Sequence, residues 1–233
     1  MRPLAARMSR LGTETAFEVL AKARALEAQG REVVHLEIGE PDFDTPPSIV
    51  AAGIAALERG ETHYTPSAGV VELREAIARW LAERRRLHVD PGQVIVTPGA
   101  KPIMFYTLLA LLEDGDEAIY PDPGFPIYAS MIQFAGARGV PLPLRERNGF
   151  DPDLDELRSL ITPRTKAIIV NSPHNPTGGV LSPASVREIA RMARDRDLWV
   201  LSDEIYGETL YEGEHRSRLA EEGMAERTIL LDG

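Results

Sequence analysis

Short apolar segments that alternate with amphipathic helical patterns constrain the fold of this chain more than any other feature. Between residues 94 and 231, apolar runs of the kind that form buried parallel strands recur, and helical patterns separate most of them. This alternation predicts a doubly wound α/β domain, with a mostly parallel sheet and helices on both faces. The expected strands are Val94–Thr97, Ala118–Tyr120, Gly139–Leu144, Ala167–Asn171, Trp199–Leu201 and Thr228–Leu231.

The N-terminal part of the chain has a different pattern. A helical pattern over Phe17–Ala28 ends at Gly30, and a short strand is expected at Val33–Ile38, before the proline-rich loop Gly39–Pro47. We therefore expect residues 1–44 to form an arm that belongs to a small domain, and residues 45–233 to form the large domain. Its expected helices are Ser48–Arg59, Val70–Arg86, Pro102–Leu112, Pro126–Ala135, Leu154–Leu160 and Pro183–Arg194.

Charge and composition exclude several classes of function. The formal net charge of −10 argues against a nucleic-acid partner, and the basic run Arg84–Arg86 is expected to be a solvated helix end. The chain has no cysteine, which excludes a thiol nucleophile and a thiolate metal site, and we expect no metal site. No membrane-spanning apolar stretch and no signal-peptide pattern occur, so we expect a cytoplasmic protein that does not contact a membrane.

Two of the loops that follow expected strands carry candidate binding residues, because ligands in such folds bind beyond the carboxyl ends of strands. Asp203 follows an apolar run directly, and Tyr206 lies on the same turn. Alternatively, Asp203 only caps this turn or pairs with an arginine. The small residues Gly99 and Ala100 precede Lys101 at a strand-to-helix turn, where backbone amides can approach an anion such as phosphate, although glycine is common at such turns without any ligand.

Two further loops add an aromatic and an amide side chain. Phe125 lies at the rim of the expected site, where an aromatic residue is more often part of the core than a stacking platform. Asn175 follows the strand Ala167–Asn171, and its amide can both donate and accept hydrogen bonds, or it can bond its own backbone in a tight turn. His174 is expected to face solvent.

These stretches together resemble the class I aminotransferases that depend on pyridoxal phosphate, the aspartate aminotransferase-like group. The resemblance covers the whole chain, and the combination of its motifs in this order is specific, whereas each motif alone is weak. The stretches that carry it are GEPDFDTP at 39–46, HYTPSAG at 63–69, TPGAK at 97–101, NSPHNPTGG at 171–179 and SDEIY at 202–206. The resemblance implies the large domain of the fold type I enzymes and pyridoxal 5'-phosphate as cofactor.

The resemblance also implies roles for the residues around the cofactor ring. Asp203 looks like the partner of the pyridinium nitrogen, where a carboxylate keeps that nitrogen protonated. Tyr206 and Asn175 look like the donors to the phenolic oxygen, and the resemblance implies that Asn175 also contacts the substrate carboxylate. Phe125 looks like the residue stacked on the ring, where many relatives carry tryptophan. The bonds Asp122–Pro123 and Asn175–Pro176 match positions where relatives often have cis peptides.

Other residues correspond to the ends of the family's site. Gly99, Ala100 and Lys101 look like part of the phosphate cup, and the side chain of Lys101 faces either the substrate or solvent. Tyr64 looks like the tyrosine that reaches the phosphate of the neighbouring subunit, which implies a homodimer. The resemblance also implies that the backbone of Gly39 lines the substrate side.

The chain departs from the family pattern in lacking the Schiff-base lysine. Lys22, Lys101 and Lys166 are its only lysines, and none matches the catalytic position, so no catalytic residue is assigned. We expect that lysine shortly after Gly233, which would make this chain the N-terminal portion of an aminotransferase and inactive alone.

The implied activity is transamination between an L-amino acid and a 2-oxo acid. The same pocket also serves C–S lyases, decarboxylases and cyclopropane synthases, which the motifs do not exclude. A non-catalytic module that binds pyridoxal phosphate is a further alternative. A nucleotide-binding domain is disfavoured, because neither a G-x-G-x-x-G nor a G-x-x-x-x-G-K-[ST] loop is present.

Overall fold

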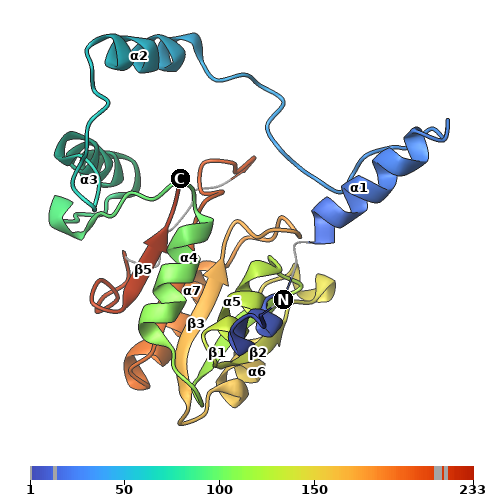
Figure 1. Ribbon diagram of the computed structural model, residues 1–233. Coiled ribbons are helices and arrows are strands. Elements are labelled where there is room, and N and C mark those ends of the chain that lie inside the picture. The colour runs from blue at the N-terminus through green and yellow to red at the C-terminus, as the bar shows by residue number, and fades with distance from the viewer. Residues whose placement is uncertain (1, 13–14, 213–216, 218–219) are drawn as a thin grey trace. The chain divides into compact units, whose positions relative to one another are not determined.

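A computed structural model describes residues 2–12, 15–212, 217 and 220–233 (Figure 1). The chain divides into two compact units, Met1–Thr13 with Val71–Gly233, and Glu14–Val70. The second unit contains helices α1 (Thr15–Glu27) and α2 (Pro47–Glu58). The division of the chain into domains between residues 44 and 45 stays a prediction.

The larger unit contains a five-stranded sheet in the order β2-β1-β3-β4-β5, and all its neighbouring strands are parallel. From β1 the chain crosses to β2 on one side and then returns to β3 on the other. Loops at such a switch point leave a crevice at the carboxyl ends of the strands, where ligands bind in α/β folds. The strands are β1 (Glu117–Asp122), β2 (Arg138–Pro143), β3 (Thr165–Asn171), β4 (Trp199–Asp203) and β5 (Thr228–Leu231).

Helices cover both faces of this sheet. Along β3, Ile168 packs with the apolar cluster of α6 and α7, whereas its neighbours Ala167 and Ile169 pack with the cluster of α4 and α5. This alternation follows from the two-residue period of a strand, and it confirms the predicted doubly wound fold. The helices of this unit are α3 (Val71–Arg85), α4 (Lys101–Leu111), α5 (Ile127–Phe134), α6 (Leu154–Leu160) and α7 (Pro183–Asp195), with short 3-10 helices η1 (Ala6–Arg10), η2 (Pro91–Gln93) and η3 (Glu146–Asn148).

Two expected strands are absent from the described part of the chain, and both predictions are wrong. Val33–Ile38 has irregular backbone, and its His35 ring nitrogens bond the carboxylates of Glu27 (2.9 Å) and Glu37 (2.7 Å). Val94–Thr97 follows η2 without joining a ladder. Apolar composition predicts burial, but a strand also needs a neighbour to accept its backbone hydrogen bonds, which local sequence does not reveal.

The amino end of the sheet holds a buried carboxylate, Glu117 of β1. Its oxygens accept hydrogen bonds from Arg138 (2.8 Å), Arg164 (2.8 Å) and the hydroxyl of Thr162 (2.7 Å). Burial alone would raise the pKa of Glu117, but these donors outweigh it and lower the pKa to about 2. The charge therefore joins the starts of β1 and β2 to the residues that precede β3.

None of the described helices is long and apolar enough to cross a membrane.

Candidate functional site

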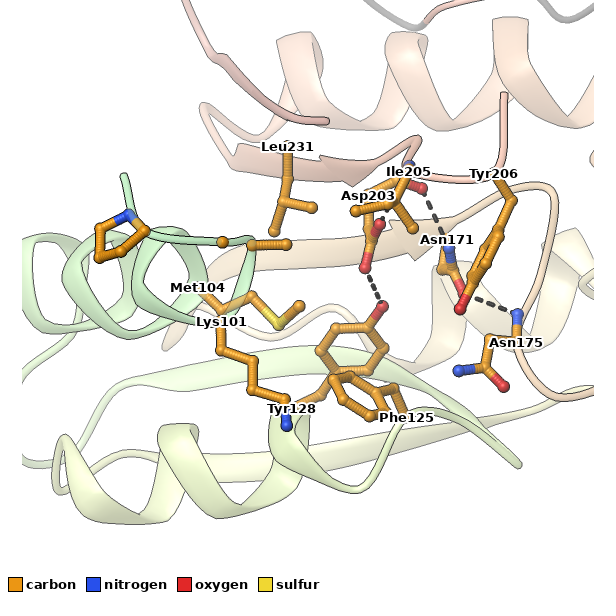
Figure 2. A pocket seen from close by; sticks show the side chains of 13 residues that line it. Lys101, Met104, Phe125, Tyr128, Asn171, Asn175, Asp203, Ile205, Tyr206 and Leu231 are labelled. Atoms are coloured by element: carbon orange, nitrogen blue, oxygen red, sulfur yellow. Dashed lines mark hydrogen bonds between the residues drawn. The ribbon is translucent and has the colours of Figure 1, made fainter. Parts of the chain in front are cut away.

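A cavity of about 340 Å³ opens at the carboxyl ends of the strands (Figure 2). Its volume lies in the range of small-molecule and cofactor pockets. Seven of the residues that the sequence predicts for the site line it: Gly99, Ala100, Lys101, Phe125, Asn175, Asp203 and Tyr206. The other lining residues are Pro98, Met104, Tyr128, Asn171, Ile205 and Leu231. The fold thus brings loops far apart in the sequence to one pocket.

Asp203 is the last residue of β4, and its side chain is buried at the cavity wall with 3% of the residue exposed. The hydroxyl of Tyr128 donates to Oδ2 at 2.6 Å, and the amide of Ile205 approaches Oδ1 at 3.3 Å. Burial raises the pKa of Asp203, and the bond from Tyr128 acts in the opposite direction. No arginine pairs with Asp203 among the described residues, whereas the bond from the Ile205 amide is the one that a turn cap would make, so a ligand contact of Asp203 stays a prediction.

Tyr128 and Asn171 are two residues of this site that the sequence reasoning missed. Asn171 ends β3, and its Nδ2 donates to the carbonyls of Pro173 and Asp203, both at 3.1 Å. Its Oδ1 accepts a hydrogen bond from the backbone N–H of Asn175 at 2.8 Å. Asn171 therefore ties the two loops that carry Asp203 and Asn175. A buried amide at a strand end is the signal that points to such a role.

The amino end of α4 borders one end of the pocket, and Asn175 and Tyr206 lie at the other end (Figure 2). Gly99 has a φ of +89°, a backbone conformation that favours glycine, and Ala100 precedes the first helical residue. The first amides of a helix have no acceptor within it, so this turn can bind an anion. The Nζ atom of Lys101 lies 6.0 Å from the centroid of the Phe125 ring.

Phe125 follows a tight turn after β1. Asp122–Pro123 is cis, as expected, and a Cβ at Gly124 would lie 2.2 Å from the carbonyl oxygen of Pro121. The Phe125 ring meets the Tyr128 ring edge-on, with 5.9 Å between centroids. In Figure 2, Phe125 and Ile205 approach the cavity from opposite sides. Two apolar side chains so placed can hold a flat ring between them.

The loop after β3 carries a second expected cis bond, Asn175–Pro176, and a third at Ser172–Pro173 that the sequence did not suggest. His174 corrects another expectation, because only 5% of it is exposed and its Nδ1 bonds the hydroxyl of Thr177 at 2.8 Å. The prediction that it faces solvent is wrong, since the loop folds back and brings Thr177 to the ring. Burial lowers the pKa of His174, which favours a neutral ring.

Arg85 also differs from its expectation of a solvated helix end. Its side chain is 3% exposed and pairs with the carboxylates of Glu204 (3.2 Å) and Asp232 (2.8 Å), which follow β4 and β5. The α3 helix is thereby joined to the strand ends beside Asp203. Gly39 and Tyr64 belong to the unit Glu14–Val70, and their predicted contacts stay predictions.

The chain is similar to a known protein family and to several of its members. The family model of aminotransferase class I and II matches residues 31–231. The aspartate/prephenate aminotransferase of Thermus thermophilus is 44% identical over 235 residues, which cover 100% of this chain and 60% of that protein. The arginine–pyruvate transaminase AruH of Pseudomonas aeruginosa is 42% identical over 93% of this chain and 55% of its own length.

A solved structure has the same fold. The aspartate aminotransferase of Thermus thermophilus with maleate superposes with a TM-score of 0.95 at 42% identity, over 100% of this chain and 60% of that one. The chain thus spans between about half and three fifths of the length of these relatives. Because the family model matches most of the chain and the sheet agrees with it, the chain belongs to the class I and II aminotransferases.

Proposed function

We propose that the polypeptide carrying this chain transfers an amino group between an L-amino acid and a 2-oxo acid, and that this chain forms most of the pocket for pyridoxal 5'-phosphate. Class I and II aminotransferases depend on this cofactor. The observation that carries the proposal is the Asp203 carboxylate, buried in a ring-sized cavity without a cationic side chain against it among the described residues. A protonated ring nitrogen supplies the missing positive charge.

The other lining groups fit the remaining parts of the cofactor. The turn of Gly99, Ala100 and Lys101 offers backbone amides to the phosphate. Asn175 and Tyr206 offer polar donors for the phenolic oxygen. When bound, the cofactor supplies an electron sink for the electrons left as the substrate's α-proton departs.

The chain's own residues serve mainly to hold and orient this group. Asp203 would hold a proton on the ring nitrogen, because its ionised form pairs with the cation. Phe125 and Ile205 would cover the two faces of the ring and exclude water. Asn175 would also orient the substrate carboxylate, with Gly39 on the substrate side.

The chain's lysines do not fit the role of attaching the cofactor and moving the α-proton. Lys22 lies in α1, and Lys166 lies at the amino end of β3, away from the pocket. Lys101 lies at the pocket, in the turn assigned to the phosphate. We propose that the Schiff-base lysine follows Gly233 in the natural polypeptide.

The proposed active unit is a homodimer in which Tyr64 reaches the phosphate of the partner's site. The large domain over residues 45–233 and a cytoplasmic location remain predictions. The relatives reported above are transaminases by name, which supports transamination over lyase or synthase chemistry and over a non-catalytic module.

The experiment compares the natural polypeptide with Asp203→Asn and with the control Asp114→Asn, whose side chain is 85% exposed. Cofactor binding is titrated by absorbance, and 2-oxo acid formation is measured with a panel of L-amino acids. We expect Asp203→Asn to lower the turnover about 100-fold or more, because it removes charge stabilisation aimed at the ring, and Asp114→Asn to leave it unchanged. A parent polypeptide that binds no cofactor, or a fully active Asp203→Asn variant, would refute the proposal.

A further inference from the structure

The Asp203 carboxylate has a buried phenol against it. The Tyr128 side chain is completely buried, and its hydroxyl donates to Oδ2 of Asp203 at 2.6 Å, as Figure 2 shows. The two residues are 75 positions apart in the sequence and come from the first turn of α5 and the end of β4. Tyr128 thus reaches the residue on which the proposed function depends.

We propose that Tyr128 is a positioning residue for the proposed transamination: its hydroxyl fixes the rotamer of Asp203 and keeps the carboxylate ionised, so that Oδ1 is presented to a cationic ring nitrogen. This inference rests on the proposed function. Tyr128 acts through Asp203 and does not contact the reacting atoms.

The position of the hydroxyl is fixed by packing. The Tyr128 ring lies in the apolar cluster of α4 and α5 and meets Phe125 edge-on, with an interplanar angle of 85°. A side chain held this way loses little further freedom when it donates a hydrogen bond, so the bond can select one orientation of its acceptor. Because Oδ2 is engaged by Tyr128, Oδ1 keeps lone pairs for a ligand, and its contact with the Ile205 amide is long at 3.3 Å.

The charges around Asp203 give this donor a second role. Burial raises the pKa of Asp203, and the carboxylates of Asp232 and Glu204 raise it further, while Tyr206 and Lys101 line the same pocket. Burial and Asp203 raise the pKa of Tyr128 as well, so its hydroxyl is protonated at neutral pH. The hydroxyl can therefore donate to the Asp203 carboxylate, and the donated bond favours the ionised form of that carboxylate.

The test uses the natural polypeptide and its Tyr128→Phe variant, which keeps the ring contacts and removes the hydroxyl. The matched control is Tyr106→Phe on α4, where the residue is 60% exposed. We expect Tyr128→Phe to bind pyridoxal phosphate about tenfold more weakly, the cost of one hydrogen bond to a charged group. Nitrogen NMR of isotope-labelled cofactor should show the ring nitrogen shifted toward its unprotonated form, and Tyr106→Phe should match the parent.

A double-mutant cycle separates positioning from general support of the fold. In an Asp203→Ala background, removal of the Tyr128 hydroxyl should change cofactor affinity by less than about twofold, because its target is gone. Equal losses in both backgrounds would overturn the inference. If Tyr128→Phe does not fold, fluorotyrosine at position 128 keeps the ring and strengthens the donor, and an unchanged ring-nitrogen signal would overturn the inference too.

The result for the unsubstituted polypeptide distinguishes the two levels of the proposal. If it binds no cofactor, the proposed function fails, and this inference fails with it. If it binds cofactor and Tyr128→Phe has the same affinity and the same nitrogen signal, only the role of Tyr128 is refuted.

Discussion

The Asn171 side chain is expected to hold the site together, which substitution can test directly. Its three hydrogen bonds join the ends of β3 and β4 to the loop of Asn175. Asn171→Ala removes all three bonds. The Pro173 carbonyl and the backbone N–H of Asn175 then lose the Asn171 side chain as their hydrogen-bond partner. The carbonyl of Asp203 is less affected, because it also accepts from the amide of Ser172 at 3.1 Å.

These bonds set the size of the effect. At about 1 kcal/mol net for each bond, with one acceptor retaining a partner, the loss of stability should be about 2–3 kcal/mol. Urea denaturation measures it as a lower midpoint with an unchanged slope. Cofactor affinity should fall as well, because the loops that carry Asp203 and Asn175 are no longer joined.

Two companion variants sharpen this test. Asn171→Asp has almost the same shape, but it places an oxygen where Nδ2 faces two carbonyl oxygens, so we expect it to be at least as destabilising as alanine. Asn148→Ala, at an exposed position in η3, is the control and should stay within about 0.5 kcal/mol of the parent. A loss below about 1 kcal/mol for Asn171→Ala, with cofactor affinity retained, would show that the three bonds do not position the site.

Two further predictions concern the sheet and the Phe125 loop. The partners of Glu117 lower its pKa from an ordinary 4.5 to about 2, so its contribution to the stability of the fold is full above about pH 4.5 and is lost as the pH falls toward 2. Because its two arginine partners are 63% and 65% exposed, we expect only about 1–2 kcal/mol, measured as a stability difference between the parent and Glu117→Gln that shrinks over this pH window. Gly124→Ala should cost about 2 kcal/mol or more and weaken cofactor binding, since its Cβ would overlap a backbone carbonyl. Gly53→Ala, where a Cβ meets nothing within 4 Å in the helix α2, should be neutral or slightly stabilising, and equal effects of both glycine substitutions would contradict the argument.

Local sequence pattern was sufficient for most of the sheet because its strands are buried on both faces. The strand predicted over the apolar run Trp199–Leu201 is present in the sheet, where it extends to Asp203. Val94–Thr97 has a similar composition but joins no described strand. The difference between them is a pairing partner, which is a tertiary property.

The site shows the same division between local and long-range information. Asp203 and Asn175 could be selected from the sequence because each follows a strand end directly. Tyr128 could not, because its partner lies 75 residues away and a tyrosine in a helical apolar pattern looks like core. His174 was misplaced for a local reason: the loop turns back on itself and brings Thr177 to its ring.

Two buried carboxylates, Glu117 and Asp203, lie at opposite ends of the sheet, and their different partners show why a ligand is expected at Asp203 and not at Glu117. Glu117 accepts hydrogen bonds from two guanidinium groups, so the fold itself stabilises its charge and lowers its pKa. Asp203 accepts hydrogen bonds from a phenol at 2.6 Å and a backbone amide at 3.3 Å instead, and burial raises its pKa. A raised pKa means that ionised Asp203 lowers the stability of the ligand-free protein as the pH rises above 3.8, the ordinary pKa of an aspartate. A cationic ring nitrogen in the cavity removes this cost, and the free energy that the fold leaves uncompensated at Asp203 becomes part of the affinity for the cofactor.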